Sequence, residues 1–258
     1  MKYTKIITHA GTHHADEILA IATIFHFVGE LPIERKYTAT DKEMTDPSIF
    51  VLDIMKKLQP ELSNFDHHQD GNIQSTNILI LDHLCKDEKL KGSLKKYLFD
   101  YVDSVDRGHV VEDRGEGIKV PTFNSIVRNL NNVDGGFDIA LQIARSTLTG
   151  FVATALSRID SEERWNGLEK EEGIAIQHDK DFLVGWRELA EPEGIKLLVH
   201  PNPRVEGAYS LTTISTDVLK IPADDRQTFL HANQFIAAYK SLGDALDHAR
   251  VIIFNLKF

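Results

Sequence analysis

Short apolar runs alternate with amphipathic stretches over the first hundred residues of the chain. The runs at 3–9 and 49–53 are rich in β-branched and aromatic residues, which is typical of buried strands, and 34–38 is a weaker strand candidate. Apolar residues within 15–28 recur at the spacing of an α-helix, which Gly29 ends. Because strands that alternate with helices build parallel sheets, we predict an α/β fold with a mainly parallel sheet flanked by helices.

The middle of the chain is predicted to be largely helical. Apolar stripes at helical spacing, such as the one formed by Leu94, Leu98 and Val102, favour four helices. These helices are predicted at 74–86, 90–106, 138–159 and 166–190. A loop rich in glycine and charge is predicted at 107–119.

The pattern changes near residue 190, where Pro192 and Gly194 interrupt the helical spacing. Three short β-like runs, one helix and a closing strand are predicted beyond this point. They lie at 196–199, 209–214, 228–230, 241–249 and 250–256, respectively. We therefore predict two domains, a larger α/β domain at 1–190 and a smaller α+β domain at 191–258.

Composition restricts the class of protein. Of 258 residues, 29 are Lys or Arg and 39 are Asp or Glu, so the formal net charge is −10 at pH 7. The single cysteine, Cys85, has no disulfide partner within the chain. We find no secretory signal and no apolar stretch that reads as a membrane span, and therefore expect a cytoplasmic protein without a membrane partner. The net acidity argues against a general nucleic-acid coat but not against a local basic groove.

Five of the 12 histidines fall in two short segments. The first segment, T-H-A-G-T-H-H-A-D-E at 8–17, follows a predicted strand and opens a predicted helix. The second, F-D-H-H-Q at 65–69, contains Asp66 beside two histidines, and Asp53 stands between the segments at the end of a strand. Sites in open α/β sheets form at the carboxyl ends of the strands, so we expect these side chains to converge.

Several imidazoles and carboxylates together form the ligand set of a divalent-metal site. Mixed nitrogen and oxygen donors suit Mn²⁺, Fe²⁺, Co²⁺ or Zn²⁺ better than Mg²⁺, although Mg²⁺ stays an alternative. The candidates exceed the needs of one tetrahedral ion, so two cations, with Mn²⁺ as the leading choice, are predicted to share a bridging carboxylate. Simpler roles exist: Asp16 and Glu17 could be first-turn acids favoured by the helix dipole, and Asp66 could be a turn residue.

The order of these motifs resembles that of the DHH phosphoesterase superfamily. More closely, it resembles the melanocyte-proliferating-gene family of metal-dependent hydrolases, described as RNA exonucleases. The resemblance rests on the first motif at 9–17, the isolated Asp53 and the D-H-H-Q segment at 66–69. It covers residues 3–110 with specific motifs and the remainder more loosely.

The resemblance implies a role for each matching residue. His68 would orient the scissile phosphate or act as an acid, with Asp66 beside it as the second catalytic candidate. Asp106 matches the acid of the fourth motif, with Asp103 as a competitor, and His13 stands where the family usually carries an aromatic residue, so it would lie behind the ligands or in solvent. The implied metal ligands are His9, His14, Asp16, Asp53, Asp66, His67 and Asp106.

The C-terminal part departs from the family pattern. Relatives usually carry a glycine-rich phosphate-binding or substrate-binding turn after a His-Ala dipeptide, which His231 matches here. Gln234, Ala237 and Ala238 replace the expected glycines, so binding of long nucleic acid through this turn is in doubt. The candidates for holding a phosphate tail are Arg107, Arg204, His231 and Lys240.

Two functions follow from these residues. The first is a metal-dependent phosphoesterase that acts on short RNA as a 3′–5′ exonuclease, or on a nucleotide phosphate or pyrophosphate. The second is a metal-binding protein without hydrolytic activity, whose second domain holds a regulatory ligand or partner. Apolar residues such as Phe235, Ile236 and Tyr239 could also cover a homodimer interface, although burial in the core would account for them equally well.

Overall fold

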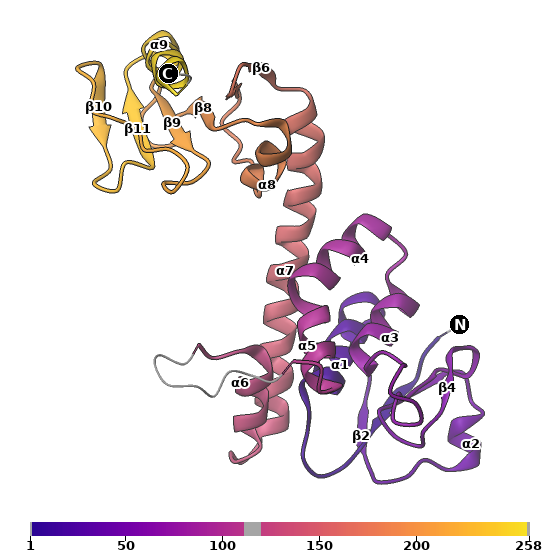
Figure 1. Cartoon of the computed structure of the whole chain (residues 1–258). Helices are drawn as coiled ribbons and strands as arrows, with labels where there is room; N and C mark the ends of the chain where they lie inside the picture. The colour runs from indigo at the N-terminus through magenta and orange to yellow at the C-terminus, as the bar shows by residue number, and fades with distance from the viewer. Residues whose placement is uncertain (1, 111–119, 257–258) are drawn as a thin grey trace. The chain divides into compact units, whose positions relative to one another are not determined.

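The computed structural model describes residues 2–110 and 120–256 (Figure 1). Its tertiary contacts divide the chain into two compact units, Met1–Leu156 and Ser157–Phe258. The division falls inside one long helix, whereas the sequence placed the domain boundary near residue 190. The strands at 169–176 account for the difference, because they pair with the strand that begins at Leu197 and so extend the second sheet. Most of the predicted loop at 107–119 lies outside the described residues.

The first unit contains a five-stranded sheet in the order β2-β1-β3-β5-β4. Its strands are β1 Lys5–Thr8, β2 Ile33–Arg35, β3 Ile49–Leu52, β4 Leu58–Gln59 and β5 Asn64–Phe65. The last residues of three parallel strands lie in one row, because Thr8 pairs with Leu52 and Leu52 with Phe65. The chain therefore leaves β1, β3 and β5 at the same edge of the sheet.

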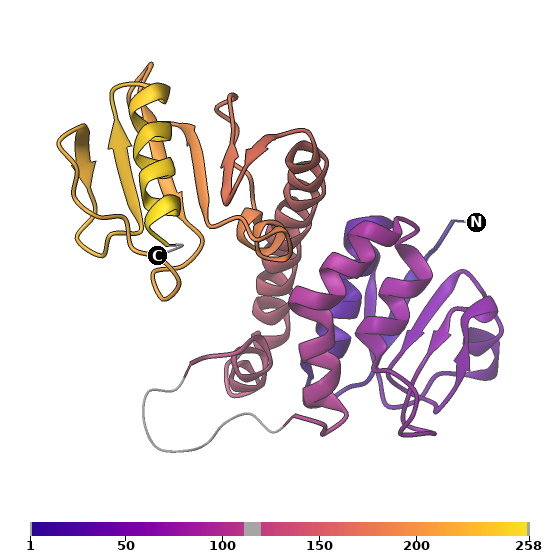
Figure 2. The ribbon, with the colours of Figure 1, turned by 45° about the horizontal axis from the view of Figure 1, so that its top comes forward.

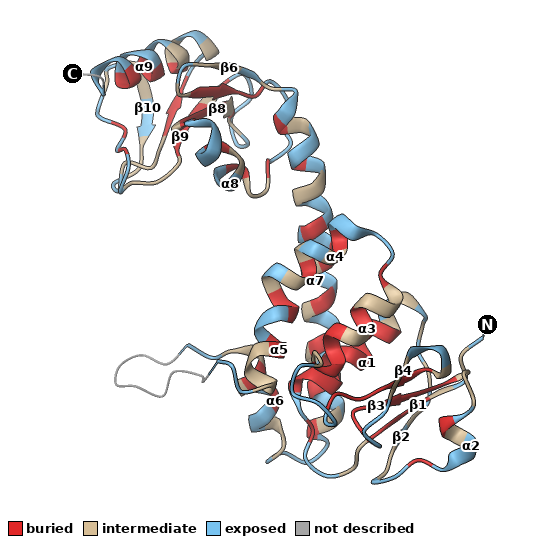
Figure 3. Ribbon diagram, turned by 45° about the vertical axis from the view of Figure 1, so that its right-hand side comes forward, coloured by how far each residue is buried: buried red, intermediate tan, exposed pale blue. Residues whose placement is uncertain are grey.

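Helices cover both faces of this sheet. Ile7, Val51 and Ile54 pack with Met44 of the short helix α2 on one face, and α1 packs against α3 within the buried core of the unit (Figure 3). The helices and turns of this unit are α1 Ala15–Phe27, α2 Asp41–Met44, η1 Pro60–Leu62, α3 Thr76–Leu84, α4 Glu88–Leu94, η2 Lys95–Phe99, α5 Asp100–Asp106 and α6 Phe123–Leu130, and α7 Gly136–Asn166 continues into the second unit. The predicted helices at 15–28 and 74–86 are confirmed, and that at 90–106 is found as α4, a π-helical turn and α5 in succession.

The second unit contains a six-stranded sheet in the order β10-β11-β9-β8-β7-β6. Its strands are β6 Glu169–Glu171, β7 Ile174–Ile176, β8 Leu197–Pro201, β9 Tyr209–Thr213, β10 Gln227–Leu230 and β11 Ile236–Tyr239. Helix α9, Leu242–Asn255, lies across one face of this sheet (Figure 2), and α8, Trp186–Ala190, continues into the short turn η3, Glu191–Glu193.

Two predicted elements of the second unit are wrong. The segment 166–190 is not one helix, because β6 and β7 occupy its first half. The closing strand at 250–256 is instead the continuation of α9, in which Ala245, Ala249, Ile252 and Ile253 form a helical stripe against the sheet. A run of β-branched residues is typical of a strand when it is considered alone. Here its apolar residues lie on one face of a helix, and that face is buried against the sheet.

The architecture is mixed α/β. Among the described residues, three of four strand pairings in the first sheet are parallel, but only one of five is parallel in the second. The prediction of α/β structure is therefore confirmed in this coarser form, and "mainly parallel" does not describe the whole chain. Tyr239 and Ile252 lie in the core, so they do not form an exposed dimer surface.

Helix α7 is long and apolar enough to cross a membrane by length and composition alone. Core helices of soluble proteins meet the same criterion, and one-third of the apolar window of α7 is buried inside the structure. The absence of a membrane partner stays a prediction.

Candidate metal centre

The parallel sheet of the first unit brings its strand ends together. His9, Asp53 and Asp66 each directly follow the last residue of β1, β3 or β5, and these three last residues are in register. The convergence is therefore a consequence of strand pairing rather than of sequence proximity. Asp53 is buried and adopts a left-handed φ of +56°, a conformation that asparagine and aspartate tolerate better than most residues. Thr76, at the start of α3, donates a hydrogen bond of 3.1 Å to its Oδ1.

The N-terminus of α1 contributes the second set of acids. Asp16 and Glu17 stand in its first turn, and both side chains are fully buried. Glu17 accepts a 2.5 Å hydrogen bond from Thr8 Oγ1 and one of 3.3 Å from the backbone N–H of His14. It therefore connects the end of β1 to the start of α1 and supports the loop between them. The sequence suggested for Glu17 the simple role of a first-turn acid favoured by the helix dipole. That role does not account for its hydrogen bond with Thr8 of β1.

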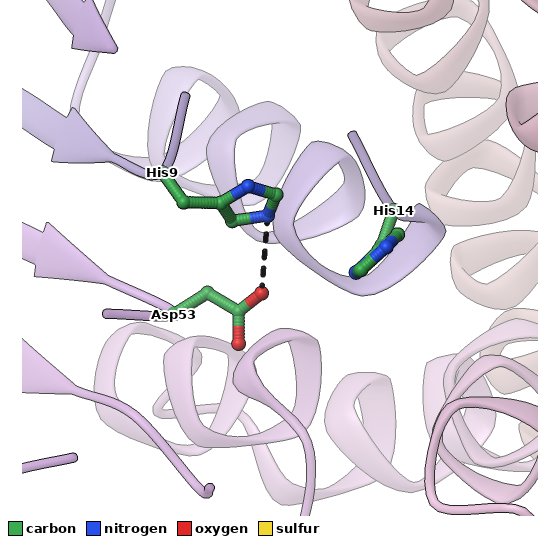
Figure 4. Close-up of side chains that lie close together, drawn as sticks. All are labelled: His9, His14 and Asp53. Carbon is green, nitrogen blue, oxygen red and sulfur yellow. Dashed lines mark ion pairs between the residues drawn. The ribbon is translucent and has the colours of Figure 1, made fainter. Parts of the chain in front are cut away.

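Three overlapping groups of side chains could each hold a metal ion. Within each group, the candidate ligand atoms lie within 4.8 Å of one another. The groups are His9 with His14 and Asp53 (Figure 4), Asp53 with His67 and His68, and His14 with Asp16 and Asp106. Asp53 and His14 each belong to two groups. A shared carboxylate between two groups is the arrangement expected of neighbouring cations.

The two acids of α5 differ in their partners. Asp106 Oδ2 lies 3.2 Å from His67 Nε2 and belongs to one of the three groups. Asp103 instead accepts two hydrogen bonds from Arg107, of 2.6 and 3.0 Å, and two from Ser75. The structure thus places Asp106, rather than Asp103, among the candidate ligands. It also shows Arg107, a predicted phosphate-binding residue, in an ion pair with Asp103.

Asp66 lies beside these groups but in none of them, among the residues that the structure describes. Its Oδ2 accepts a 2.6 Å hydrogen bond from Lys56 N, and its Oδ1 accepts from both the backbone N–H and Nδ1 of His68. The side chain of His68 is 49% exposed, against 17% for that of His9 and 10% for that of His67. This hydrogen bond raises the pKa of His68, with burial acting against it. Asp66 therefore orients His68.

The charges and burial of the cluster suit a divalent cation. Burial raises the pKa of the Asp16 carboxyl well above its usual range, and Asp53 and Asp106 add to this effect. Neither oxygen of Asp16 has a hydrogen-bond partner among the residues that the structure describes, although both are buried. An ionised carboxylate in such a place is costly unless a positive charge compensates it. The donor set and the unpartnered carboxylate therefore fit a divalent metal.

The neighbouring carboxylates raise the pKa values of two imidazoles in the cluster. Burial lowers the pKa of His9, but contacts with Asp53 and Glu17 outweigh it and raise the value to about 10. Burial also lowers the pKa of His67, which contacts with Asp106 and Asp53 likewise raise to about 10. His9 Nδ1 lies 3.3 Å from the carbonyl oxygen of Ala10, so this nitrogen can donate to it and leave Nε2 as the ligand atom. Both rings are therefore protonated at pH 7, and a cation that bound to their ligand nitrogens would replace a proton on each ring.

Residues outside the predicted set hold the loop that carries His9 and His14. Arg35 donates hydrogen bonds to the carbonyl oxygens of His9 and Gly11, at 3.2 and 2.8 Å, respectively. Its guanidinium lies 4.2 Å from the centre of the Phe137 ring, and His13 contacts the same ring edge to face. His13 is buried, so the expectation of a solvent position is wrong and the position behind the ligands is the one found. Nothing in the local sequence pairs residue 35 or 137 with this loop.

The remaining predicted substrate residues lie in the second unit. Arg204, His231 and Lys240 line one cavity of about 870 Å³, together with aromatic residues such as Phe229 and Phe235. The segment expected to carry glycines is a strand instead, because Ala237 and Ala238 lie within β11. Gln234 alone adopts a left-handed φ, of +59°. The structure therefore groups three of the four predicted residues and leaves Arg107 in the first unit.

These features define a candidate divalent-metal centre at the strand ends of an α/β unit. Residues 5–81 match the MYG1 exonuclease model, described as an uncharacterised protein family (UPF0160). The resemblance to the melanocyte-proliferating-gene family is thereby confirmed over this segment. No curated protein matches the chain.

Solved structures show only distant likenesses. One is PggH, a pGpG-specific phosphodiesterase from Vibrio cholerae, at 10% identity and a TM-score of 0.30, covering 100% of this chain and 99% of that chain. Another is RecJ from Thermus thermophilus in complex with Mg²⁺, at 9% identity and a TM-score of 0.32, covering 98% and 50%. A third is an exonuclease RecJ bound to manganese, at 11% identity and a TM-score of 0.27, covering 98% and 90%. These scores are too low to assign roles to residues.

Proposed function

We propose that the protein is a metal-dependent phosphoesterase that hydrolyses phosphoester bonds in short RNA, as a 3′–5′ exonuclease, or in nucleotide phosphates. The observation that carries the proposal is the pair of candidate metal groups that share Asp53. The family match over residues 5–81, to a model labelled as an exonuclease, supports the same reaction class.

The cluster would hold two divalent cations, for which Mn²⁺ is the first choice. His9, His14, Asp16, Asp53, His67 and Asp106 supply the donors, and the predicted ligation by Asp66 stays an expectation. When bound, such ions lower the pKa of water and neutralise charge on a phosphoryl group. Asp53 is the residue best placed to serve both ions.

The protein's own residues supply positioning and a proton. His68 is held through Nδ1 by Asp66, so Nε2 is the nitrogen left to hydrogen-bond a phosphate oxygen or to protonate a leaving oxygen. The raised pKa of His68 favours the protonated form that such donation requires. Exposure of this side chain gives a substrate access to it.

The cavity of the second unit that Arg204 lines would bind an anionic ligand. It combines Arg204, Lys240 and His231 with apolar walls, which suits an anionic group attached to a ring or sugar. The formal net charge of −10 disfavours a long polyanion along the surface. Short RNA and small phosphate esters are therefore the proposed substrates.

A substrate panel tests the reaction class. Protein supplemented with Mn²⁺ is incubated with 3′-labelled short RNA, dinucleotides, 3′-phosphoadenosine phosphate and pyrophosphate, each with and without a chelator. Hydrolysis of at least one substrate that the chelator abolishes is the expected result. Hydrolysis that survives chelation would contradict metal dependence.

The strand at Ala237 and Ala238 favours a second candidate function. Without the expected glycines, the second unit could hold a regulatory ligand or partner while the first unit binds metal without hydrolysis. Retention of metal together with no turnover on any member of the panel would select this alternative.

A further inference from the structure

The second sheet has one face that α9 does not cover. Leu197, Val199, Leu211 and Ala237 pack toward α9, so the alternating residues of the same strands point to the opposite face. There, Leu198 pairs with Thr212 across β8 and β9. Helix α8 covers only part of this face, where Trp186 packs with Leu198.

A cavity of about 330 Å³ lies on this face beside Trp186. Its apolar lining includes Phe182, Leu183, Trp186, Leu198, Phe235 and Ile236. Cavities of a few hundred Å³ with mostly apolar walls and a few polar groups are typical of small-molecule sites. The side chain of Phe182 is exposed although it is large and apolar, at 70% of its full area.

Arg187 provides a positive charge at this cavity. Its guanidinium stacks 4.9 Å from the centre of the Trp186 ring and donates hydrogen bonds to the carbonyl oxygens of Ile214 (2.9 Å) and Thr213 (3.3 Å). Within residues 2–110 and 120–256, no carboxylate lies at ion-pair distance from it. Two of its five N–H groups are thus engaged with backbone, and since Arg187 is exposed, the others are accessible to an anion.

Three other polar residues of the cavity already have partners. His200 contacts the Pro201 carbonyl and Thr212 Oγ1, both at 3.0 Å, and burial lowers its pKa, which keeps the ring neutral. Gln177 Nε2 lies within hydrogen-bond distance of three oxygens of the loop at 179–181, and Asp179 of that loop forms an ion pair with Arg164. Asp181 and Lys180, also at this cavity, are exposed.

We propose that this cavity binds a planar aromatic ring that carries one anionic group. The ring would lie among Phe182, Phe235 and Trp186, and the anion would bind Arg187. A nucleoside monophosphate and an aromatic carboxylic acid share this chemistry. The site lies within the second unit and does not depend on the metal cluster, so its failure leaves the proposed hydrolysis untouched.

Calorimetric titration of the full-length, chelator-treated protein tests the site. The probes are adenosine 5′-monophosphate, naphthalene-2-carboxylate, adenosine and inorganic phosphate. Either or both of the first two should bind, and adenosine and phosphate should each bind at least about tenfold more weakly than the tighter one, since a charge-assisted hydrogen bond contributes about 1.5 kcal/mol or more. The tighter of the first two identifies the ligand source.

Variants then locate the site. Arg187→Gln and Phe182→Ala should each weaken binding of that probe, the first by about tenfold or more. Lys220→Gln, an exposed cation of the second unit that is not among the described residues lining this cavity or the neighbouring one, is the matched control and should leave the affinity unchanged. Arg204→Gln probes the neighbouring cavity, which shares Pro203, Phe235 and Ile236 as walls, and should weaken binding less than Arg187→Gln. Equal affinity in Arg187→Gln and the original protein, a loss in Arg204→Gln as large as in Arg187→Gln, or no binding of either ring-bearing anion at millimolar concentration would overturn the proposal.

Discussion

The side-chain amide of Asn131 forms hydrogen bonds with both backbone groups of His13. Asn131 Oδ1 accepts from His13 N at 2.8 Å, and Asn131 Nδ2 donates to His13 O at 2.9 Å. Asn131 follows α6, more than a hundred residues along the chain from the loop that carries His9 and His14. It therefore holds the middle of a loop whose two ends provide candidate metal ligands.

Replacing Asn131 with alanine should weaken metal binding without unfolding the protein. Both hydrogen bonds to His13 are lost, so the loop is less well fixed, and residues that orient ligands typically change metal affinity by about 10–100-fold. The measurement is calorimetric titration with Mn²⁺. Asn132→Ala is the matched control, because within the described part of the chain the Asn132 side chain donates only to Asn129 O. Equal Mn²⁺ affinities in the two variants would show that the hydrogen bonds between Asn131 and His13 do not position the ligands.

Asp106 and Asp103 should respond differently to the same substitution. Asp106→Asn removes a candidate ligand beside His67 and is expected to lower Mn²⁺ affinity with little change in the free energy of unfolding. Asp103→Asn removes the charge that pairs with Arg107 in a partly buried ion pair, so the free energy of unfolding should fall, by less than the roughly 3–5 kcal/mol typical of a broken, fully buried pair. Urea unfolding and metal titration of both variants separate the two effects. The reverse pattern would assign the ligand role to Asp103.

Metal binding should release protons. In the metal-free protein, the carboxylates around His9 and His67 raise their pKa values to about 10, so both rings are protonated at pH 7. A cation bound through these nitrogens must displace the protons, and affinity should rise with pH up to about 10. Titrations in buffers of different ionisation enthalpy count the released protons. A proton count near zero, with affinity independent of pH between 6 and 8, would argue against ligation by these histidines.

His248 should make the stability of the protein depend on pH. Burial lowers the pKa of its ring, whose Nδ1 lies 2.6 Å from Tyr239 Oη, so the unfolded state binds more protons than the folded state near pH 6. Its contribution is complete above the unfolded pKa of about 6.5 and is lost as pH falls through the folded pKa, with a slope of at most about 1.4 kcal/mol per pH unit. Urea unfolding between pH 5 and 8 should give a shallower slope for His248→Gln. An identical slope would exclude this residue as the cause.

The sequence predicted the metal cluster better than the surroundings that hold it. His9 and Asp53 follow apolar runs that were predicted as strands of a parallel sheet, so their convergence was accessible from the pattern, whereas the two-residue strand before Asp66 was not predicted. Arg35, Asn131 and Phe137 reach the same loop through tertiary packing that no local spacing encodes.

The second unit was harder to predict, for a physical reason. The run that begins at Val251 has strong β propensity. However, its apolar residues follow Ala245 and Ala249 at helical spacing, and together they form one apolar stripe that packs against the sheet. Likewise, β6 and β7 are three residues each, too short for a periodic signal to separate them from the end of α7.

Metal content and turnover of the Asp53→Asn variant test the central claim most directly. Asparagine keeps the shape and the tolerance for a left-handed φ at this position but removes the charge that two candidate groups share. The account predicts two Mn²⁺ per chain and chelator-sensitive hydrolysis in the original protein. It predicts at most one Mn²⁺ and no turnover in Asp53→Asn, with unfolding still cooperative. Unchanged turnover in this variant would contradict the account.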